Sequence, residues 1–184
     1  MMRQVILVTG AARSGKSEWA ERLAAESGKQ IVYMATAQRY ENDSDWDARI
    51  DQHIARRPGG WRSLEVPFDL ARAIDLGIEN ECFLIDSLGS WVGNGLEMNE
   101  VDWQLSCDCL ISSVKSGIAS LIFVSEETGW GVIPAYPMGR LFRDRLGRLI
   151  REVGQVADQT FLVVAGFAVD VQRIGVAIDR PKIL

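Results

Sequence analysis

Histidine and cysteine are scarce in this chain, and long apolar runs are missing. The three cysteines, Cys82, Cys107 and Cys109, are odd in number, and the Cys-x-Cys pair has no second pair to complete a zinc site, so reduced thiols are expected. The longest late apolar run, FLVVAGFAV, falls well short of the roughly 20 residues that a membrane helix needs, and the amino-terminal run is too short for a signal peptide. These absences predict a cytoplasmic protein without a membrane span.

Positive charge is also in short supply. The chain has 20 basic and 25 acidic residues, a net charge of −5, which argues against non-specific nucleic-acid binding but leaves room for a local basic pocket. With 184 residues, 47% of them apolar, the chain is long enough for one well-filled core and too short for two typical domains. A single domain over residues 1–184 is therefore expected, although the tail after about residue 167 has no clear pattern.

Short apolar runs alternate with helical patterns along the chain. Continuous apolarity, rather than alternation, indicates strands that are covered on both faces, as in a parallel sheet. The runs cover 4–9, 31–35, 82–86, 121–125 and 160–165, and the helical patterns cover 17–27, 45–57, 67–76, 101–116 and 139–157. This order predicts an α/β fold with three layers and right-handed crossovers.

A phosphate-binding loop follows the first expected strand. The segment GAARSGKS fits G-x-x-x-x-G-K-[ST] and lies between a strand and a helix, as that motif requires, which weakens the alternative of a chance match in a loop rich in glycine and serine. Its backbone N–H groups and the following helix amino terminus favour phosphate. Lys16 should reach the β- and γ-phosphates and Ser17 should bind Mg²⁺. The fold class is thus P-loop NTPase-like, with a mainly parallel central sheet.

Asp86 ends the third apolar run. It resembles the second acidic element of P-loop enzymes, at the carboxyl end of a strand, where open α/β sheets bind ligands. The alternative is that Asp86 only caps the next helix. The residues alone leave both possibilities open.

The only histidine, His53, lies in ARIDQHIARRPGGW beside three arginines. At 100° per residue, Arg49, His53, Arg56 and Arg57 share one flank of the expected helix 45–57. Clustered arginines repel one another unless an anion binds, and positive charge nearby favours the neutral, nucleophilic imidazole. A structural histidine on a solvated basic face is the alternative.

Several segments together resemble one family, the bifunctional adenosylcobinamide kinase/adenosylcobinamide-phosphate guanylyltransferases of cobalamin biosynthesis. The matching segments occur in family order and cover roughly Val5 to Gly166: LVTGAARSGKS, VYMATAQ, RIDQHIARRPGGWRSLE, FLIDSLGSWVGN, VSEETGWGVIP, GRLFRDRLGRL and ADQTFLVVAG. The R-I-x-x-H-x-x-x-R-P motif with Trp61 and the Gly-x-Gly-Val-Ile-Pro loop are much more specific than the P-loop.

The resemblance implies two activities. One moves the γ-phosphoryl group of ATP or GTP to the aminopropanol hydroxyl of adenosylcobinamide. The other transfers GMP from GTP, through a histidine that matches His53, to adenosylcobinamide phosphate, giving adenosylcobinamide-GDP and pyrophosphate. The resemblance also implies Mg²⁺ as cofactor and a homo-oligomer, a trimer.

The resemblance further implies a set of nucleotide-binding residues, with His53 and Lys16 catalytic. The set comprises Gly10, Ala11, Ala12, Arg13, Ser14, Gly15, Lys16, Ser17, Ala35, Thr36, Ala37, Ile54, Ala55, Arg56, Arg57, Glu65 and Asp86. A carboxylate can accept both Watson–Crick donors of guanine, so Glu65 or Asp86 could select that base.

Two positions depart from the family pattern, since Glu126 and Ile150 each stand where an asparagine is usual. They leave the corrinoid side and the balance of the two activities less defined than the nucleotide site. The glycines around Trp130 suit either a loop that closes over a large flat ligand or a surface turn. The arginines at 140, 143, 145 and 148 are expected to face water rather than phosphate.

Two other functions stay open. A plain P-loop kinase would use His53 only to contact phosphate and would form no covalent adduct. A nucleotide-gated regulatory module would show negligible turnover, and its affinity for a partner would depend on the γ-phosphate.

Overall fold

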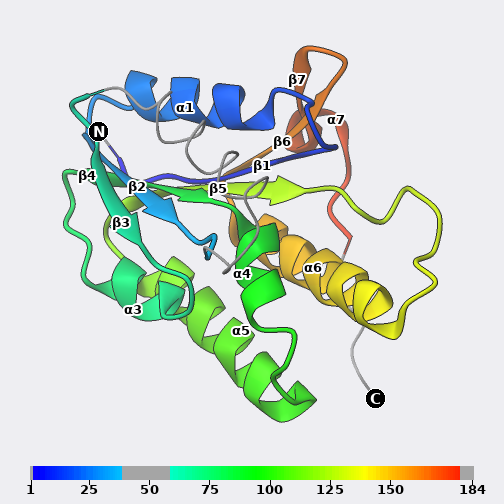
Figure 1. The fold of residues 1–184 in the computed structure, drawn as a ribbon. Coiled ribbons are helices and arrows are strands. Elements are labelled where there is room, and N and C mark those ends of the chain that lie inside the picture. Colours follow the sequence, from blue (N-terminus) through cyan, green and yellow to red (C-terminus); the bar gives the residue numbers. More distant parts are fainter. Residues whose placement is uncertain (1, 39–58, 179–184) are drawn as a thin grey trace.

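One mixed sheet forms the centre of the computed structural model, which describes residues 2–38 and 59–178 (Figure 1). The strands are β1 (Val5–Gly10), β2 (Gln30–Ala35), β3 (Arg62–Glu65), β4 (Glu81–Asp86), β5 (Ser120–Glu126), β6 (Gln159–Val164) and β7 (Phe167–Asp170). Their spatial order is β3-β2-β4-β5-β1-β6-β7, and only the β6–β7 pair is antiparallel. The expected α/β fold with a mainly parallel sheet is confirmed.

Helices cover both faces of this sheet (Figure 1). They are α1 (Lys16–Glu26), α3 (Leu70–Asp75), α4 (Leu88–Asn94), α5 (Glu100–Ser116), α6 (Pro137–Val156) and α7 (Val171–Ile174). In β1, Ile6 and Val8 pack on the α1 side, while Val5 and Leu7 pack on the side of α3, α4, α5 and α6. Successive β1 side chains therefore enter two separate apolar clusters, which is why the strand is apolar throughout.

The expected elements agree with the structure to within a few residues wherever it describes the chain. The structure adds β3, α4, β7 and α7, and the expected helix 45–57 falls outside the described residues. The segment after residue 167, which had no clear pattern, continues the sheet as β7. Within the described part of the chain, no helix is long and apolar enough to cross a membrane.

All three cysteines are free thiols, as expected. Burial raises the pKa of Cys82 to about 11, and burial together with nearby carboxylates raises the pKa of Cys107 to about 12. Cys109 is exposed on α5. The described residues contain no cluster of histidine, cysteine and carboxylate side chains that could hold a metal ion.

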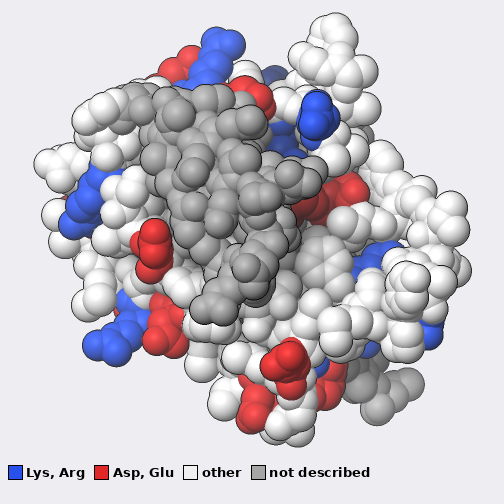
Figure 2. Space-filling model, viewed as in Figure 1, with Lys and Arg blue, Asp and Glu red and all other residues white. Residues whose placement is uncertain are grey.

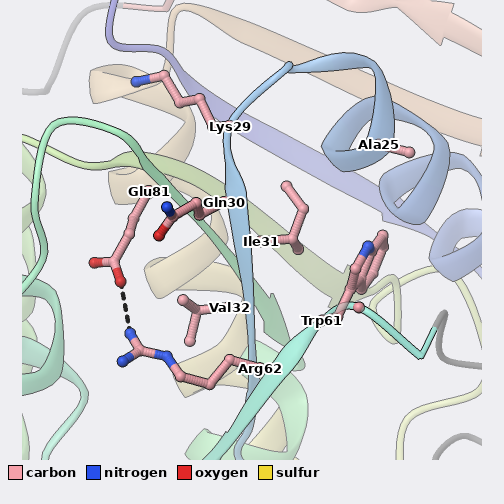
Figure 3. A pocket seen from close by; sticks show the side chains of 9 residues that line it. Ala25, Lys29, Gln30, Ile31, Val32, Trp61, Arg62 and Glu81 are labelled. Atoms are coloured by element: carbon pink, nitrogen blue, oxygen red, sulfur yellow. Dashed lines mark hydrogen bonds and ion pairs between the residues drawn. The ribbon is translucent and has the colours of Figure 1, made fainter.

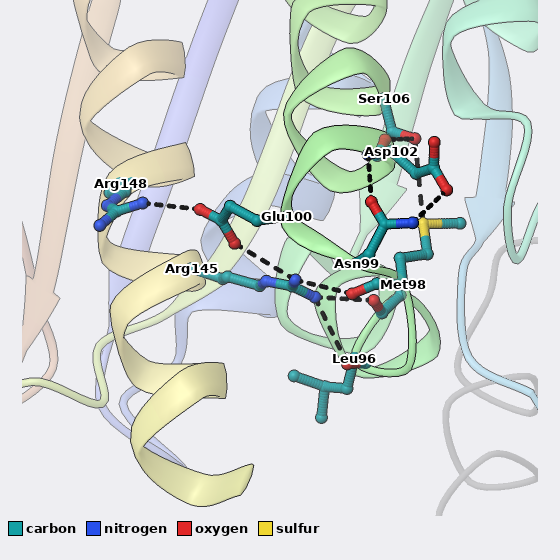
Figure 4. Close-up of polar contacts among 9 residues, drawn as sticks. Leu96, Met98, Asn99, Glu100, Asp102, Ser106, Arg145 and Arg148 are labelled. Atoms are coloured by element: carbon teal, nitrogen blue, oxygen red, sulfur yellow. Dashed lines mark hydrogen bonds and ion pairs between the residues drawn. The ribbon is translucent and has the colours of Figure 1, made fainter. Parts of the chain in front are cut away.

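The expectation that all four α6 arginines face water is wrong for Arg145, which is only 3% exposed. Its guanidinium lies over the Trp103 ring, 4.9 Å from the centroid, and donates to the carbonyl oxygens of Gly95 and Met98, each at 2.9 Å (Figure 4). In the turn between α4 and α5, the Gly95 carbonyl oxygen also accepts from Met98 N at 3.1 Å, so the arginine fork adds a second donor there and supplies a charged donor to the Met98 carbonyl oxygen. Arg148 remains exposed and pairs with Glu100 at 3.0 Å.

Candidate functional site

The loop Gly10–Ser17 joins the carboxyl end of β1 to the first turn of α1, as the sequence predicts. Gly15 is the N-cap of α1 with φ +93°, and Arg13 has φ +59°, so two residues take the left-handed conformation that turns the backbone sharply. A Cβ at Gly10 would lie 2.5 Å from the Val163 carbonyl oxygen of β6. The two motif glycines are therefore required for different reasons. Gly15 adopts a positive φ, and Gly10 lies too close to a neighbouring strand to carry a side chain.

The P-loop carries polar side chains that could bind an anion. Lys16 is half-buried, and its Nζ lies 3.5 Å from the Ala11 carbonyl oxygen, a long contact that a phosphate would replace with a stronger one. The Ser14 hydroxyl is buried and makes no hydrogen bond within the described residues. Ser17 is buried in the first turn of α1. The loop therefore offers a lysine, two serine hydroxyls and a helix amino terminus to an anion.

Residues from five strands meet at the same edge. The β2–β3 register sets Ala35 opposite Glu65, and the β2–β4 register sets Ala35 opposite Asp86. On the other side, the β1–β5 register sets Gly10 opposite Glu126. The carboxyl ends of parallel strands thus bring the predicted Glu65 and Asp86 into one row with the P-loop.

Asp86 is fixed by neighbouring strands rather than by a helix. Its Oδ2 accepts a hydrogen bond from the Tyr33 hydroxyl at 2.7 Å. The N-cap of α4 is Ser87, whose hydroxyl accepts a hydrogen bond from Ser90 N at 3.2 Å, so the alternative that Asp86 is the helix cap is wrong. Asp86 is left as a carboxylate at the nucleotide end of β4.

Thr36 ties β2 to the start of α4. It is fully buried, its hydroxyl donates to the Ser87 carbonyl oxygen at 2.6 Å, and it accepts from Ser87 N at 2.8 Å. The Asn94 amide donates to the carbonyl oxygens of Thr36 and Pro67, at 2.8 Å each. These bonds hold the predicted segment Ala35–Ala37 against the end of β4, with Ala37 following Thr36 on the same strand end.

Glu126 is a buried carboxyl group between Asp86 and the P-loop. Burial raises its pKa, and the negative charge of Asp86 raises it further, while a hydrogen bond with Ser87 and the positive charge of Lys16 partly offset both. Glu126 Oε2 makes no hydrogen bond within the described part of the chain and presses on Gly89, where an added Cβ would collide with it. The raised pKa favours the neutral carboxyl form, which presents one donor and one acceptor, as an amide does, and this fits the family position of Glu126.

The other departure from the family pattern has a packing explanation. Ile150 lies on α6 and packs against the apolar cluster that includes Leu146 and Leu149. An amide at this position would need partners within that cluster, whereas isoleucine needs none.

The oxygen donors at this edge fit a divalent cation. Mg²⁺ prefers carboxylate and hydroxyl oxygens, and such a set is available in Ser17, at the start of α1, and Asp86, at the end of β4.

The remaining predicted site residues lie outside the described residues. They are His53, Ile54, Ala55, Arg56 and Arg57.

A pocket of about 500 Å³ elsewhere on the molecule is lined by residues that include Lys29, Trp61 and Arg62 (Figure 3). It lies where β2 and β4 begin, at the edge opposite the P-loop, and its Glu81 already pairs with Arg62 at 2.6 Å. This pocket is therefore not the predicted nucleotide site.

Sequence reasoning missed several residues that shape the site. Tyr33, Ser87 and Asn94 orient Asp86 and Thr36, and Glu127 accepts from the Thr9 hydroxyl at 2.8 Å beside the P-loop. A serine directly after a strand is a common helix cap and could have been recognised. The tyrosine and asparagine contacts join distant segments, and no local pattern marks them.

The sheet, with a strand, a glycine-rich loop and a helix at its nucleotide edge, defines a P-loop nucleotide-binding protein. A family model described as cobinamide kinase/cobinamide phosphate guanyltransferase matches residues 6–171. The chain belongs to this family, which confirms the resemblance seen in its motifs.

Curated relatives match over most of their length. The chain is 39% identical over 169 residues to the bifunctional adenosylcobalamin biosynthesis protein CobP of Pseudomonas aeruginosa, covering 90% of this chain and 94% of that protein. It is 34% identical over 183 residues to the bifunctional adenosylcobalamin biosynthesis protein CobU of Escherichia coli K12, covering 91% of this chain and 99% of that protein.

Solved structures share the fold at low sequence identity. The ATPase EscN from the type III secretion system of enteropathogenic E. coli aligns with a TM-score of 0.56 at 13% identity, covering 96% of this chain and 50% of that one. A Pyrococcus horikoshii OT3 protein, PH0250, aligns with a TM-score of 0.56 at 9% identity, covering 98% and 94%. These likenesses concern the fold alone.

Proposed function

We propose that this chain is a bifunctional enzyme of cobalamin biosynthesis. In the first reaction, the hydroxyl of adenosylcobinamide attacks the γ-phosphorus of ATP or GTP, and the bond to the β-phosphate oxygen breaks. In the second, a His53 nitrogen attacks the α-phosphorus of GTP and pyrophosphate leaves. The phosphate of adenosylcobinamide phosphate then attacks the same phosphorus, breaking the P–N bond and forming adenosylcobinamide-GDP.

One observation carries this proposal: the row of nucleotide-facing groups at the carboxyl edge of the sheet. The P-loop lies between β1 and α1, and the strand registers set Glu126 beside Gly10 and Glu65 and Asp86 on either side of Ala35. Phosphoryl transfer depends on positioning and charge neutralisation, which a P-loop lysine and backbone N–H groups supply. Family membership adds the choice of acceptor.

Each predicted residue then has a role. Lys16 neutralises charge on the β- and γ-phosphates, and the backbone from Gly10 to Ser17 surrounds them. Ser17 and Asp86 would hold Mg²⁺, which supplies charge neutralisation when bound. Glu65, exposed at the end of β3, is the carboxylate with room to accept the guanine edge, since Asp86 already accepts from Tyr33.

The same proposal covers the organisation of the chain. Residues 1–184 form one catalytic domain that acts in the cytoplasm as a homo-oligomer, a trimer. Mass measurement by sedimentation tests the oligomeric state directly.

Intact-mass spectrometry after incubation with GTP and Mg²⁺ tests the function. The native chain should gain one GMP in an acid-labile bond, and His53→Ala should gain none, because the imidazole is the nucleophile. His53→Ala should still phosphorylate adenosylcobinamide, whereas Lys16→Ala should lose that reaction. A GTP-binding native chain that never carries GMP would leave the simple kinase as the function.

A further inference from the structure

The loop between β5 and α6, residues 127–136, carries apolar side chains into solvent. Trp130 is 73% exposed, Val132 94% and Ile133 63%. Figure 1 shows this loop projecting away from the sheet, and the same side of the molecule is largely free of charged side chains in Figure 2. Contiguous exposed apolar side chains of this kind mark binding surfaces more often than isolated ones do.

The first end of this loop is fastened to the P-loop strand. Glu127 N donates to the Gly10 carbonyl oxygen at 3.0 Å, and the Thr9 hydroxyl donates to Glu127 Oε1 at 2.8 Å. Gly10 is the first residue of the phosphate-binding loop. The loop 127–136 therefore starts directly beside the place where the nucleotide phosphates would bind.

The second end is fastened to α6. Arg140 donates to the carbonyl oxygens of Pro134 and Ala135, at 3.0 and 2.8 Å. Gly139 allows the close packing of Pro134, since an added Cβ there would lie 2.8 Å from the proline Cβ. Two anchors thus hold the loop while its tip stays clear of the other residues that the structure describes.

The tip has space around it. An added Cβ at Gly129 or at Gly131 would meet no atom within 4 Å. Trp130 lies between these two glycines with most of its surface exposed. A flat ligand could therefore cover the indole without displacing another part of the described chain.

We propose that the tip, Trp130, Val132 and Ile133, is the surface against which the corrin ring of the acceptor packs, with Trp130 as the main contact. This inference rests on the proposed function. The acceptor hydroxyl must reach the terminal phosphate beside Gly10, so the rest of this large molecule must extend from the same edge. A broad macrocycle with apolar faces matches one aromatic and two aliphatic side chains, and an indole buries a large area at little conformational cost.

Trp130→Ala and Leu76→Ala form a matched pair for the test. Leu76 is 74% exposed and follows α3, at the opposite edge of the sheet. Leu76→Ala therefore measures the effect of losing an apolar surface side chain far from the loop. Adenosylcobinamide binding is measured by equilibrium dialysis, and its KM is measured in the kinase reaction with saturating ATP. GMP labelling from GTP alone, without a corrinoid, reports on the nucleotide site.

Trp130→Ala should weaken adenosylcobinamide binding and raise its KM roughly tenfold or more, as the loss of an aromatic anchor does. Trp130→Phe should recover part of the affinity. The KM for ATP and GMP labelling should change by less than about twofold, and Leu76→Ala should change nothing beyond this range.

Unchanged corrinoid affinity in Trp130→Ala would overturn the proposal, as would a loss of GMP labelling in step with it, which would assign the loop to the nucleotide. A smaller molecular mass of Trp130→Ala in sedimentation, with unchanged corrinoid affinity, would assign the loop to a contact between copies of the chain. If the native chain binds the corrinoid through Trp130 but phosphorylates nothing, the loop proposal stands and the proposed function fails.

Discussion

Replacing Arg145 with methionine should destabilise the protein strongly, although the residue is an arginine on a helix with several others. Arg145 donates to the carbonyl oxygens of Gly95 and Met98 at 2.9 Å each, and it covers the Trp103 ring. Methionine keeps the unbranched stem of the side chain but removes every donor and the guanidinium that lies over the Trp103 ring. The Met98 carbonyl oxygen would then lose this charged donor, and so would the Gly95 carbonyl oxygen, which keeps its bond from Met98 N at 3.1 Å.

The expected magnitude follows from these contacts. A hydrogen bond from a charged donor contributes roughly 1.5–3 kcal/mol, and an unpaired buried acceptor retains its desolvation cost. The unpaired Nε of Arg145 is itself buried at a cost, which methionine removes. We therefore expect a loss of about 2–4 kcal/mol in the free energy of unfolding, from two such hydrogen bonds offset in part by removal of the buried Nε.

Urea unfolding at neutral pH measures this loss as a lower midpoint with an unchanged slope. Arg148→Met is the control, because Arg148 also pairs with Glu100 but its side chain is 69% exposed. The control should lose no more than about 1 kcal/mol. If the free energies of unfolding of the two variants lay within about 1 kcal/mol of each other, burial of Arg145 would add nothing to its contribution to stability, contrary to this prediction.

Two further substitutions probe the nucleotide edge of the sheet. Gly10→Ala should weaken GTP binding by roughly tenfold or more, measured by calorimetry, because the added Cβ would lie 2.5 Å from a strand carbonyl, and Gly129→Ala, with open space around it, should not. Because the pKa of Glu126 is raised in the folded protein, its contribution to stability is present below its ordinary value of 4.5 and is lost as the pH rises through the folded pKa. Glu126→Gln should therefore gain stability relative to the native chain from about pH 4 to pH 8 in urea unfolding, and parallel curves across this range would contradict the shifted pKa.

Much of the sheet could be predicted because its strands are covered on both faces. β1, β4 and β5 are almost wholly buried, so their sequences are apolar without interruption. β3 was missed because RSLE is exposed along its length and lies at the sheet edge. An edge strand obtains its hydrogen bonds from one neighbour only, and its side chains need no apolar pattern.

The sequence-based prediction failed most clearly for a charged side chain that the structure buries. Helical periodicity places Arg145 among arginines, and charge alone predicts exposure. The structure buries Arg145 because, in the turn after α4, its guanidinium donates to the Met98 carbonyl oxygen and adds a second donor to the Gly95 carbonyl oxygen. The partners lie 47 and 50 residues away in sequence, so no local pattern could identify them.

The candidate site likewise contains features that the local sequence predicts and features that depend on residues far apart in the chain. The P-loop could be predicted because its phosphate ligands are backbone groups of one short segment, and the motif encodes their geometry. Asp86 could be predicted because parallel strands bring their carboxyl ends to one edge, whatever their register. The neighbourhood of Glu126 could not, since burial and the charge of Asp86 raise its pKa while Ser87 and Lys16 lower it, and three different elements bring these residues to it. From the sequence alone, a glutamate at position 126 in place of an amide indicates an added negative charge. In the fold, burial raises the pKa of Glu126 and so favours its neutral form, which resembles an amide in its hydrogen-bonding groups.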